Sequence, residues 1–298
     1  MGILAMRSWL PLTVALLWTL CALTHLPAQA QNPADYPTEP ILQTETGMHT
    51  APIKRIAVDR AEQFLVSGSD DKTVRVWDLA SGRLLRTLRV PLGAGSVGKI
   101  YAVAISPDGQ SIAVGGYTGP SSGKNNDIIY IFDRASGELR QRIAGLQNVI
   151  NHLAYSPDGR HLAAVFGGAN GLRVYETGTY REVAQDREYG DSAYWVAFDP
   201  SGKLVSTSDD GYLRLYDSAF QLRRKVQTPG RKLPFAAAFS PDGRHIAVGY
   251  LDSTRVDVFA AEDLKRAYAA NTMGATNGDL SKVALVAGRA LPLHCWAL

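Results

Sequence analysis

The chain has almost no cysteine and little net charge. Only Cys21 and Cys295 occur among its 298 residues, too few for a disulfide framework or a paired-cysteine metal site. The net charge of +3 mixes both signs along the chain, which predicts no nucleic-acid partner, because such proteins usually carry a clustered basic face. Stability must therefore come from an apolar core, for which a hydrophobic content of 46% is sufficient.

Motifs for catalysis and ligand binding are also missing. The sequence contains no nucleophile elbow, no phosphate-cradling glycine loop and no metal-ligand spacing. The acid pairs Asp70-Asp71 and Asp209-Asp210 occupy the same turn of two repeats, which indicates turn formation rather than a calcium site. We therefore predict no enzyme activity, no catalytic residue, no metal site and no cofactor.

The longest apolar run lies at the N-terminus. Arg7 precedes an apolar stretch from Trp9 to Leu26, and Ala28-Gln29-Ala30 supplies a small-x-small cleavage site. This pattern predicts a secretory signal peptide over 1–30, followed by a linker over 31–40. An uncleaved membrane anchor is the alternative, because the run approaches spanning length. After cleavage we expect an exported protein, in the periplasm or outside the cell, with no stable membrane insertion.

A repeated segment dominates the rest of the chain. Four copies have the pattern small-apolar-Ser/Asp-Pro-Asp/Ser-Gly, and a diverged copy precedes them; they begin at Ala57, Ala104, Ala154, Ala197 and Ala238. The proline of the pattern stands at 107, 157, 200 and 241, and the diverged copy has Arg60 in its place. These five positions are 47, 50, 43 and 41 residues apart. Repeats of about 40–45 residues with several short strands are typical of propeller blades.

Each repeat contains signals for four strands. The Ser-Pro-Asp-Gly segment fits a type I turn between two antiparallel strands. A third strand alternates apolar and polar residues before an aromatic, as in Val74–Trp77 and Leu213–Tyr216. A more polar fourth strand follows, and its Lys and Arg suit an outer edge. The fold class is therefore predicted as an all-β propeller of four-stranded antiparallel blades over 41–298, with five clear blades and an incomplete sixth. We expect the blades to start near residues 53, 100, 150, 193, 234 and 281.

These repeats resemble the WD-repeat (Trp-Asp) β-propellers, here of an exported bacterial type. The segment Gly68–Asp78 is similar to the family's repeat ending, and His49 lies eight residues before Ala57, where the family has a histidine. The resemblance implies a structural hydrogen-bond chain of His49, Asp71, Trp77 and a serine, either Ser67 or Ser69. Repeats two to five lack the histidine and the tryptophan, so we expect packing to hold those blades instead.

The end of the sequence leaves ring closure open. Ser281–Leu285 starts a sixth unit, but the repeat pattern is lost after Ala284. Either the ring has a thin sixth blade, or the chain is a truncated or frame-altered form of a longer protein, which we favour slightly. By resemblance, Pro40–Glu45 is expected to complete the last blade.

One position in each repeat varies, whereas the alanine three residues after it is the same in all five repeats. The position lies three residues before the alanine that begins each copy of the pattern. Its occupants are Lys54, Tyr101, Asn151, Tyr194 and Phe235, and Trp195 is beside Tyr194 in the sequence. The WD-repeat resemblance places this position at the entrance of the central channel, and two longer loops, 90–99 and 118–127, on the same face. Variation in size and polarity suits a recognition surface, and aromatics are good anchors there. Packing between neighbouring blades is the alternative role.

These features together predict a non-catalytic protein-interaction platform of the cell envelope. It would bind a protein or peptide partner on the channel-entrance face. One alternative is a sensor or regulatory propeller within a longer protein, for example one fused to a protease. Another is a propeller that binds a small ligand in its channel.

Overall fold

A computed structural model describes residues 47–119, 126–231, 233–273, 282–286 and 289–293. These residues form twenty-two β-strands and one short 3-10 helix at Pro229–Arg231. No helix among them is long and apolar enough to cross a membrane. The signal peptide and linker predicted over 1–40 and the strand expected at Pro40–Glu45 lie outside these residues.

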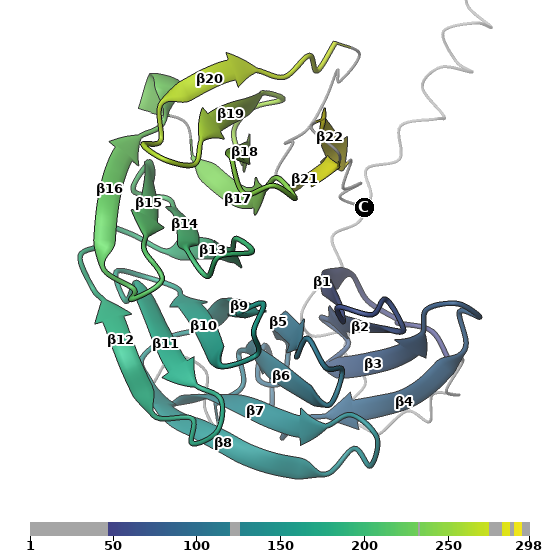
Figure 1. Cartoon of the computed structure of the whole chain (residues 1–298). Coiled ribbons are helices and arrows are strands. Elements are labelled where there is room, and N and C mark those ends of the chain that lie inside the picture. The colour runs from purple at the N-terminus through teal and green to yellow at the C-terminus, as the bar shows by residue number, and fades with distance from the viewer. Residues whose placement is uncertain (1–46, 120–125, 232, 274–281, 287–288, 294–298) are drawn as a thin grey trace, which may run out of the picture. The chain divides into compact units, whose positions relative to one another are not determined.

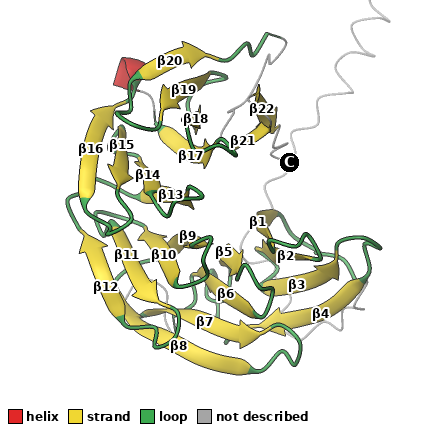
Figure 2. Ribbon diagram, viewed as in Figure 1, coloured by secondary structure: helices red, strands yellow, loops and turns green. Residues whose placement is uncertain are grey.

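The strands form five four-stranded sheets and one two-stranded sheet, with antiparallel pairing throughout (Figures 1 and 2). We number the sheets blades 1 to 6 in chain order. Their strands are β1 (Ile53–Val58), β2 (Phe64–Ser69), β3 (Thr73–Asp78) and β4 (Leu84–Arg89); β5 (Ile100–Ile105), β6 (Ser111–Gly116), β7 (Asp127–Asp133) and β8 (Leu139–Leu146); β9 (Ile150–Tyr155), β10 (His161–Phe166), β11 (Leu172–Glu176) and β12 (Glu182–Asp186); β13 (Ala193–Phe198), β14 (Leu204–Ser208), β15 (Tyr212–Tyr216) and β16 (Leu222–Gln227); β17 (Pro234–Phe239), β18 (His245–Tyr250), β19 (Val256–Ala260) and β20 (Arg266–Ala269); and β21 (Lys282–Val286) with β22 (Arg289–Leu293).

The predicted fold class is confirmed: apart from one short 3-10 helix, the described residues are all-β, with five four-stranded antiparallel blades and a two-stranded sixth sheet. The first strand of each blade packs against the first strand of the next, from β1 on β5 to β17 on β21, and the fourth strands lie outermost (Figure 1). Apolar side chains fill the layers between blades. Val74 and Val76 of blade 1, for example, are buried in one cluster with Ile100 and Val103 of blade 2.

The repeated Ser-Pro-Asp-Gly segment forms the turn between the first two strands. In blade 2 the Gly109 amide donates to the Ser106 carbonyl at 2.8 Å, and the Ser106 hydroxyl donates to the Asp108 carboxylate at 2.5 Å. Gly109 has a φ of +69°, a conformation that is costly for residues with a Cβ atom. The proline, acid and glycine of the repeat are therefore requirements of the turn.

A buried chain of hydrogen bonds crosses blade 1. Trp77 Nε1 donates to Ser67 Oγ at 2.9 Å, and Ser67 Oγ lies 2.7 Å from His49 Nε2. His49 Nδ1 lies 2.8 Å from Asp71 Oδ2. One proton arrangement satisfies every member: tryptophan donates to serine, serine to histidine, and histidine to the carboxylate. Burial alone would raise the pKa of Asp71, but hydrogen bonds from Thr73, His49 and Thr50 outweigh it and lower this pKa.

Blade 4 contains a second polar chain, built from tyrosines. Tyr189 lies eight residues before Ala197, as His49 does before Ala57. The Tyr189 hydroxyl lies 2.5 Å from Ser206 Oγ and 2.9 Å from the Tyr216 hydroxyl, which donates to Asp186 Oδ2 at 2.6 Å. The expectation that packing alone holds blades 2 to 5 is therefore wrong for blade 4, because a phenol can occupy the histidine position and still bond the serine.

An arginine of blade 1 extends to three other blades. Arg55 on β1 is only 7% exposed. It donates to the Asn151 carbonyl of blade 3 at 3.0 Å and to the Tyr101 carbonyl of blade 2 at 3.4 Å. Its guanidinium carbon lies 4.4 Å from the ring centre of Trp195 in blade 4. Trp195 in turn stacks on His152 of blade 3, with ring centres 4.0 Å apart. One side chain thus connects the inner strands of four blades.

Replacing Tyr189 by phenylalanine should destabilise the protein. Tyr189→Phe removes a hydroxyl shared by the buried Ser206 and Tyr216, and leaving buried polar groups without a partner costs about 1–3 kcal/mol. Urea denaturation of the full chain measures the change. Tyr268→Phe is the matched control, because the Tyr268 side chain is 46% exposed. Equal stability of the two variants would contradict the structural role of Tyr189.

Replacing Arg55 by methionine should have a larger effect. Arg55→Met keeps the length of the side chain but removes the hydrogen bonds to two carbonyls and the contact with Trp195. Together these losses should lower the free energy of unfolding by roughly 3 kcal/mol, measured by urea denaturation. Arg60→Met, at an exposed arginine in the first turn of blade 1, should change it little. A similar small effect at both positions would show that Arg55 does not connect the blades.

Candidate functional site

The five residues predicted to line the channel entrance share one structural feature. In each of the first five blades, the pairing of the first and second strands shifts by one residue near the start of the first strand. The residue left out of the ladder at this β-bulge is Lys54, Tyr101, Asn151, Tyr194 or Phe235. A β-bulge redirects a side chain, and bulges are common at rims and next to binding sites. The sequence showed the position but not the bulge.

Four of these five side chains remain partly accessible. Lys54, Tyr101, Tyr194 and Phe235 are half-buried. Asn151 differs, because it is only 7% exposed and its amide donates to the Ala193 carbonyl at 2.9 Å. Asn151 therefore joins blades 3 and 4 and has little surface to offer a partner.

Trp195 does not lie in the row of bulged residues. It is the next residue along β13, it pairs with Thr207, and both Arg55 and His152 stack on its ring. The tryptophan therefore lies among the inner strands that support the surface.

The accessible residues form two aromatic pairs. Tyr101 meets Tyr117 edge to face with ring centres 5.3 Å apart, and Tyr194 lies against Phe235 at 5.0 Å. Lys54 Nζ lies 3.2 Å from Asp70 Oδ2 and 5.8 Å from the centre of the Tyr101 ring. We call Lys54, Tyr101, Tyr117, Tyr194 and Phe235 the bulge face.

Tyr117 was not predicted from the sequence. It follows β6 directly, and its carbonyl accepts a hydrogen bond from the Gly98 amide at 2.7 Å. The loop at 90–99 therefore contacts the bulge face at Tyr117. The other long loop, 118–127, lies partly outside the described residues. A signal for Tyr117 existed in the sequence, because it follows the apolar second strand of its repeat at the end nearest Tyr101.

Carboxylates lie near Tyr194 of the second aromatic pair. Burial and the nearby Asp209 and Asp191 raise the pKa of Tyr194 to about 12. The pKa of Asp209 is also raised, first by burial and then by the negative charges of Asp191, Asp210 and Asp252, although a hydrogen bond from Tyr194 opposes this shift. Asp210 is neutralised by Arg214 at 2.5 Å. Blades 4 and 5 thus give this part of the bulge face a negative character.

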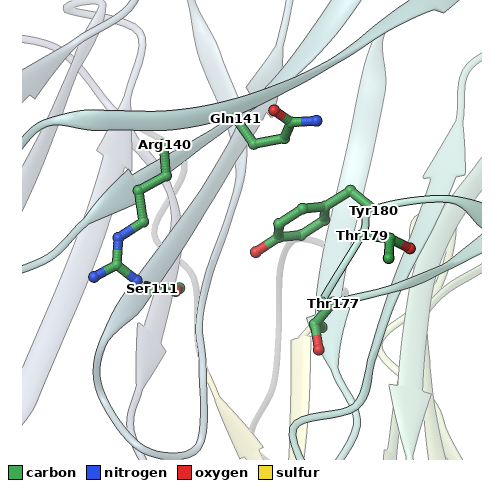
Figure 3. A pocket seen from close by; sticks show the side chains of 7 residues that line it. Ser111, Arg140, Gln141, Thr177, Thr179 and Tyr180 are labelled. Atoms are coloured by element: carbon green, nitrogen blue, oxygen red, sulfur yellow. Dashed lines mark hydrogen bonds between the residues drawn. The ribbon is translucent and has the colours of Figure 1, made fainter.

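A separate hollow of about 380 Å³ lies between blades 2 and 3. Its lining is polar, with Ser111, Arg140 and Gln141 on one side and Thr177, Gly178, Thr179 and Tyr180 on the other (Figure 3). Arg140 is already bound to Asp133. No nucleophile is paired with a base there, and the described residues contain no cluster of histidine, cysteine or acidic side chains suited to a metal ion.

Comparison with known families locates two of the repeats. The family described as "WD domain, G-beta repeat" matches residues 42–78 and 188–217. These segments contain the two buried polar chains, from His49 to Trp77 in blade 1 and from Tyr189 to Tyr216 in blade 4.

Similar proteins come from eukaryotes. Protein HIR1 of Eremothecium gossypii is 24% identical over 249 residues, which cover 70% of this chain and 29% of that protein. A ribosome biogenesis protein BOP1 homolog of Anopheles gambiae is 24% identical over 263 residues, 76% of this chain and 30% of the relative. Nuclear distribution protein PAC1 of Coccidioides posadasii is 27% identical over 174 residues, 52% and 34% of the two chains. The similarity therefore spans only about a third, or less, of each of these proteins.

The predicted localisation in the periplasm or outside the cell is wrong. The relatives are eukaryotic, whose cells have no periplasm, and one is named for ribosome biogenesis, a process inside the cell. The exported bacterial type is likewise unsupported. The prediction depended on one apolar run within residues 1–30, which lies outside the part of the chain that the structure describes. The two matched repeats and the four-stranded antiparallel blades support the WD-repeat family for this chain.

Proposed function

We propose that this protein is a non-catalytic interaction platform that binds an extended segment of a partner protein on its bulge face. WD-repeat propellers are scaffolds for protein–protein interaction. The observation that carries the proposal is that the β-bulges of blades 1, 2, 4 and 5 hold variable, partly accessible residues, three of them aromatic. Each bulge releases one side chain from its ladder, while the rigid blade fixes its position.

The aromatic pairs supply the anchor positions. Half-buried tyrosine and phenylalanine rings bring large contact areas with few rotatable bonds, which is why aromatic residues are enriched among the residues that dominate binding. Tyr101 with Tyr117 and Tyr194 with Phe235 are already in contact. Little side-chain entropy would then be lost when a partner binds.

The charges favour a partner that carries a lysine or arginine at blades 4 and 5. Asp209 is destabilised by burial and by its acidic neighbours, and a cation from a partner would relieve that repulsion. The same cation could rest on the Tyr194 ring, as in other cation–π contacts. At blade 1 the corresponding acid, Asp70, is already paired with Lys54.

A quantitative pull-down from a lysate of the source cells tests the proposal. Tyr101→Ala combined with Tyr194→Ala should reduce recovery of a specific partner at least about tenfold, as expected when hot-spot side chains are removed. Tyr268→Ala, at an exposed tyrosine on the outer strand β20, is the matched control and should leave recovery unchanged. Unchanged recovery with the double variant would exclude the bulge face.

The acidic neighbours of Asp209 also predict a pH-dependent stability. Because the pKa of Asp209 is raised in the folded protein, its ionisation weakens the fold as pH rises through that pKa. Asp209→Asn should therefore increase the free energy of unfolding at pH 7, and the gain should vanish below the ordinary carboxyl pKa of 3.8. Urea denaturation at both pH values measures it. Asp71→Asn should instead decrease the free energy of unfolding at pH 7, because the folded protein lowers the pKa of Asp71 and so favours its ionised form. A loss of stability in Asp209→Asn at pH 7 would contradict this account.

A further inference from the structure

A buried carboxylate in blade 5 holds two arginines. Asp257 on β19 is fully buried, at 0% exposure. Its Oδ1 accepts from Arg255 Nε at 2.8 Å and from Arg266 Nε at 2.7 Å, and its Oδ2 accepts from the Tyr250 hydroxyl at 2.9 Å. The shared oxygen makes the two guanidinium groups immediate neighbours.

Neutralising Asp257 does not require both arginines. One guanidinium balances one carboxylate, as Arg214 does for Asp210 in blade 4, where the two side chains are 0% and 9% exposed. The Arg255 and Arg266 side chains are 37% and 38% exposed instead. Within the described part of the chain, their hydrogen bonds use Nε, and no acceptor bonds their Nη amines. Asp257 thus orients two forked donors toward solvent with one positive charge in excess.

A third arginine faces the same junction but lies near an acid of its own. Arg224 on β16 stands opposite Leu215 on β15, and directly opposed residues in a sheet project from the same face. Leu215 packs in one cluster with Phe259 of blade 5, so Arg224 lies on the face of blade 4 that meets blade 5. Asp263 pairs with Lys265 at 2.9 Å, and the charge of Arg224 also helps to lower the pKa of this acid. Glu262 lies near Lys265 as well, so neither Arg224 nor Lys265 adds to the excess charge.

Blade 5 also differs from blades 1, 3 and 4 in the charged residue of its third strand. Where blades 1, 3 and 4 have Arg75, Arg173 and Arg214 in the third strand, blade 5 has Asp257. The charge at the centre of the blade is reversed, and the two arginines lie around it near the surface. Two guanidinium groups so close together repel each other, and an anion bound between their Nη amines would offset that repulsion.

We propose that Arg255 and Arg266 form a phosphate-binding site at the junction of blades 4 and 5, separate from the bulge face. Guanidinium forks match the oxygens of a phosphate group and bind them in pairs. The two forks of Arg255 and Arg266, with one positive charge in excess over Asp257, suit the several anionic oxygens of a phosphate better than a single carboxylate. The ligand is inorganic phosphate or a phosphomonoester on a protein side chain.

Calorimetric titration of the full chain at constant ionic strength tests this site. Sodium phosphate, O-phosphoserine and sodium acetate are titrated separately. Saturable binding of one or both phosphates, clearly tighter than acetate, is expected. The tighter of the two phosphates identifies the source, free phosphate or a phosphorylated side chain.

Variants connect the binding to the two arginines. Arg255→Gln and Arg266→Gln should each weaken phosphate binding at least about tenfold, as expected for the loss of a charge-assisted partner. Arg223→Gln is the matched control, because Arg223 is an exposed arginine on β16 that pairs with Asp217. If a glutamine variant fails to fold by circular dichroism, Arg266→Lys replaces it, since lysine keeps the charge and loses the fork. No saturable phosphate binding, or equal affinity in the wild type and the arginine variants, would overturn the proposal.

Discussion

The close packing of the first and second strands of each blade against the first strand of the next is the constraint on which the rest of this structure depends. A Cβ atom added to Gly68 on β2 would lie 2.6 Å from Ile100 of the next blade, and one added to Gly115 on β6 would lie 2.8 Å from Ile150. Such crowding explains why small residues recur near the axis. It also accounts for the usefulness of the bulge, which turns one larger side chain per blade away from the crowded layer.

Buried polar groups in the crowded blades need partners, and the chain meets that need in two ways. Blade 1 uses histidine, serine, tryptophan and aspartate, whereas blade 4 builds an equivalent chain from Tyr189, Ser206 and Tyr216. The two blades share one geometry. In each, the side chain eight residues before the repeat's alanine (Ala57 or Ala197) forms a hydrogen bond with a serine of the second strand. The side chain at that position is histidine in blade 1 and tyrosine in blade 4. The fold requires a partner for the buried serine and does not require one particular residue type.

Local patterns in the sequence were sufficient to predict the turns and the four-stranded antiparallel blades. The turn at Ser106–Gly109 is an example, because proline, aspartate and glycine each have a local reason to be there. Contacts between blades were not predictable. Nothing in the sequence near Arg55 indicates that it stacks on Trp195, and the partners of Asp257 depend on how β19 and β20 pair. The position of Asn151 in the repeat was recognised, but its burial depends on the neighbouring Ala193.

The contacts of Arg55 also constrain the order in which the chain folds. Its hydrogen bond to Asn151 spans 96 residues of sequence, and Trp195 lies still further along. Closing loops of that length costs conformational entropy before any contact compensates for it, so we expect the contacts to form late. Blade 1 is synthesised first, yet its inner strand can reach its final environment only after blades 3 and 4 have emerged. Until then the earliest part of the propeller must persist without the contacts that later fix it in place.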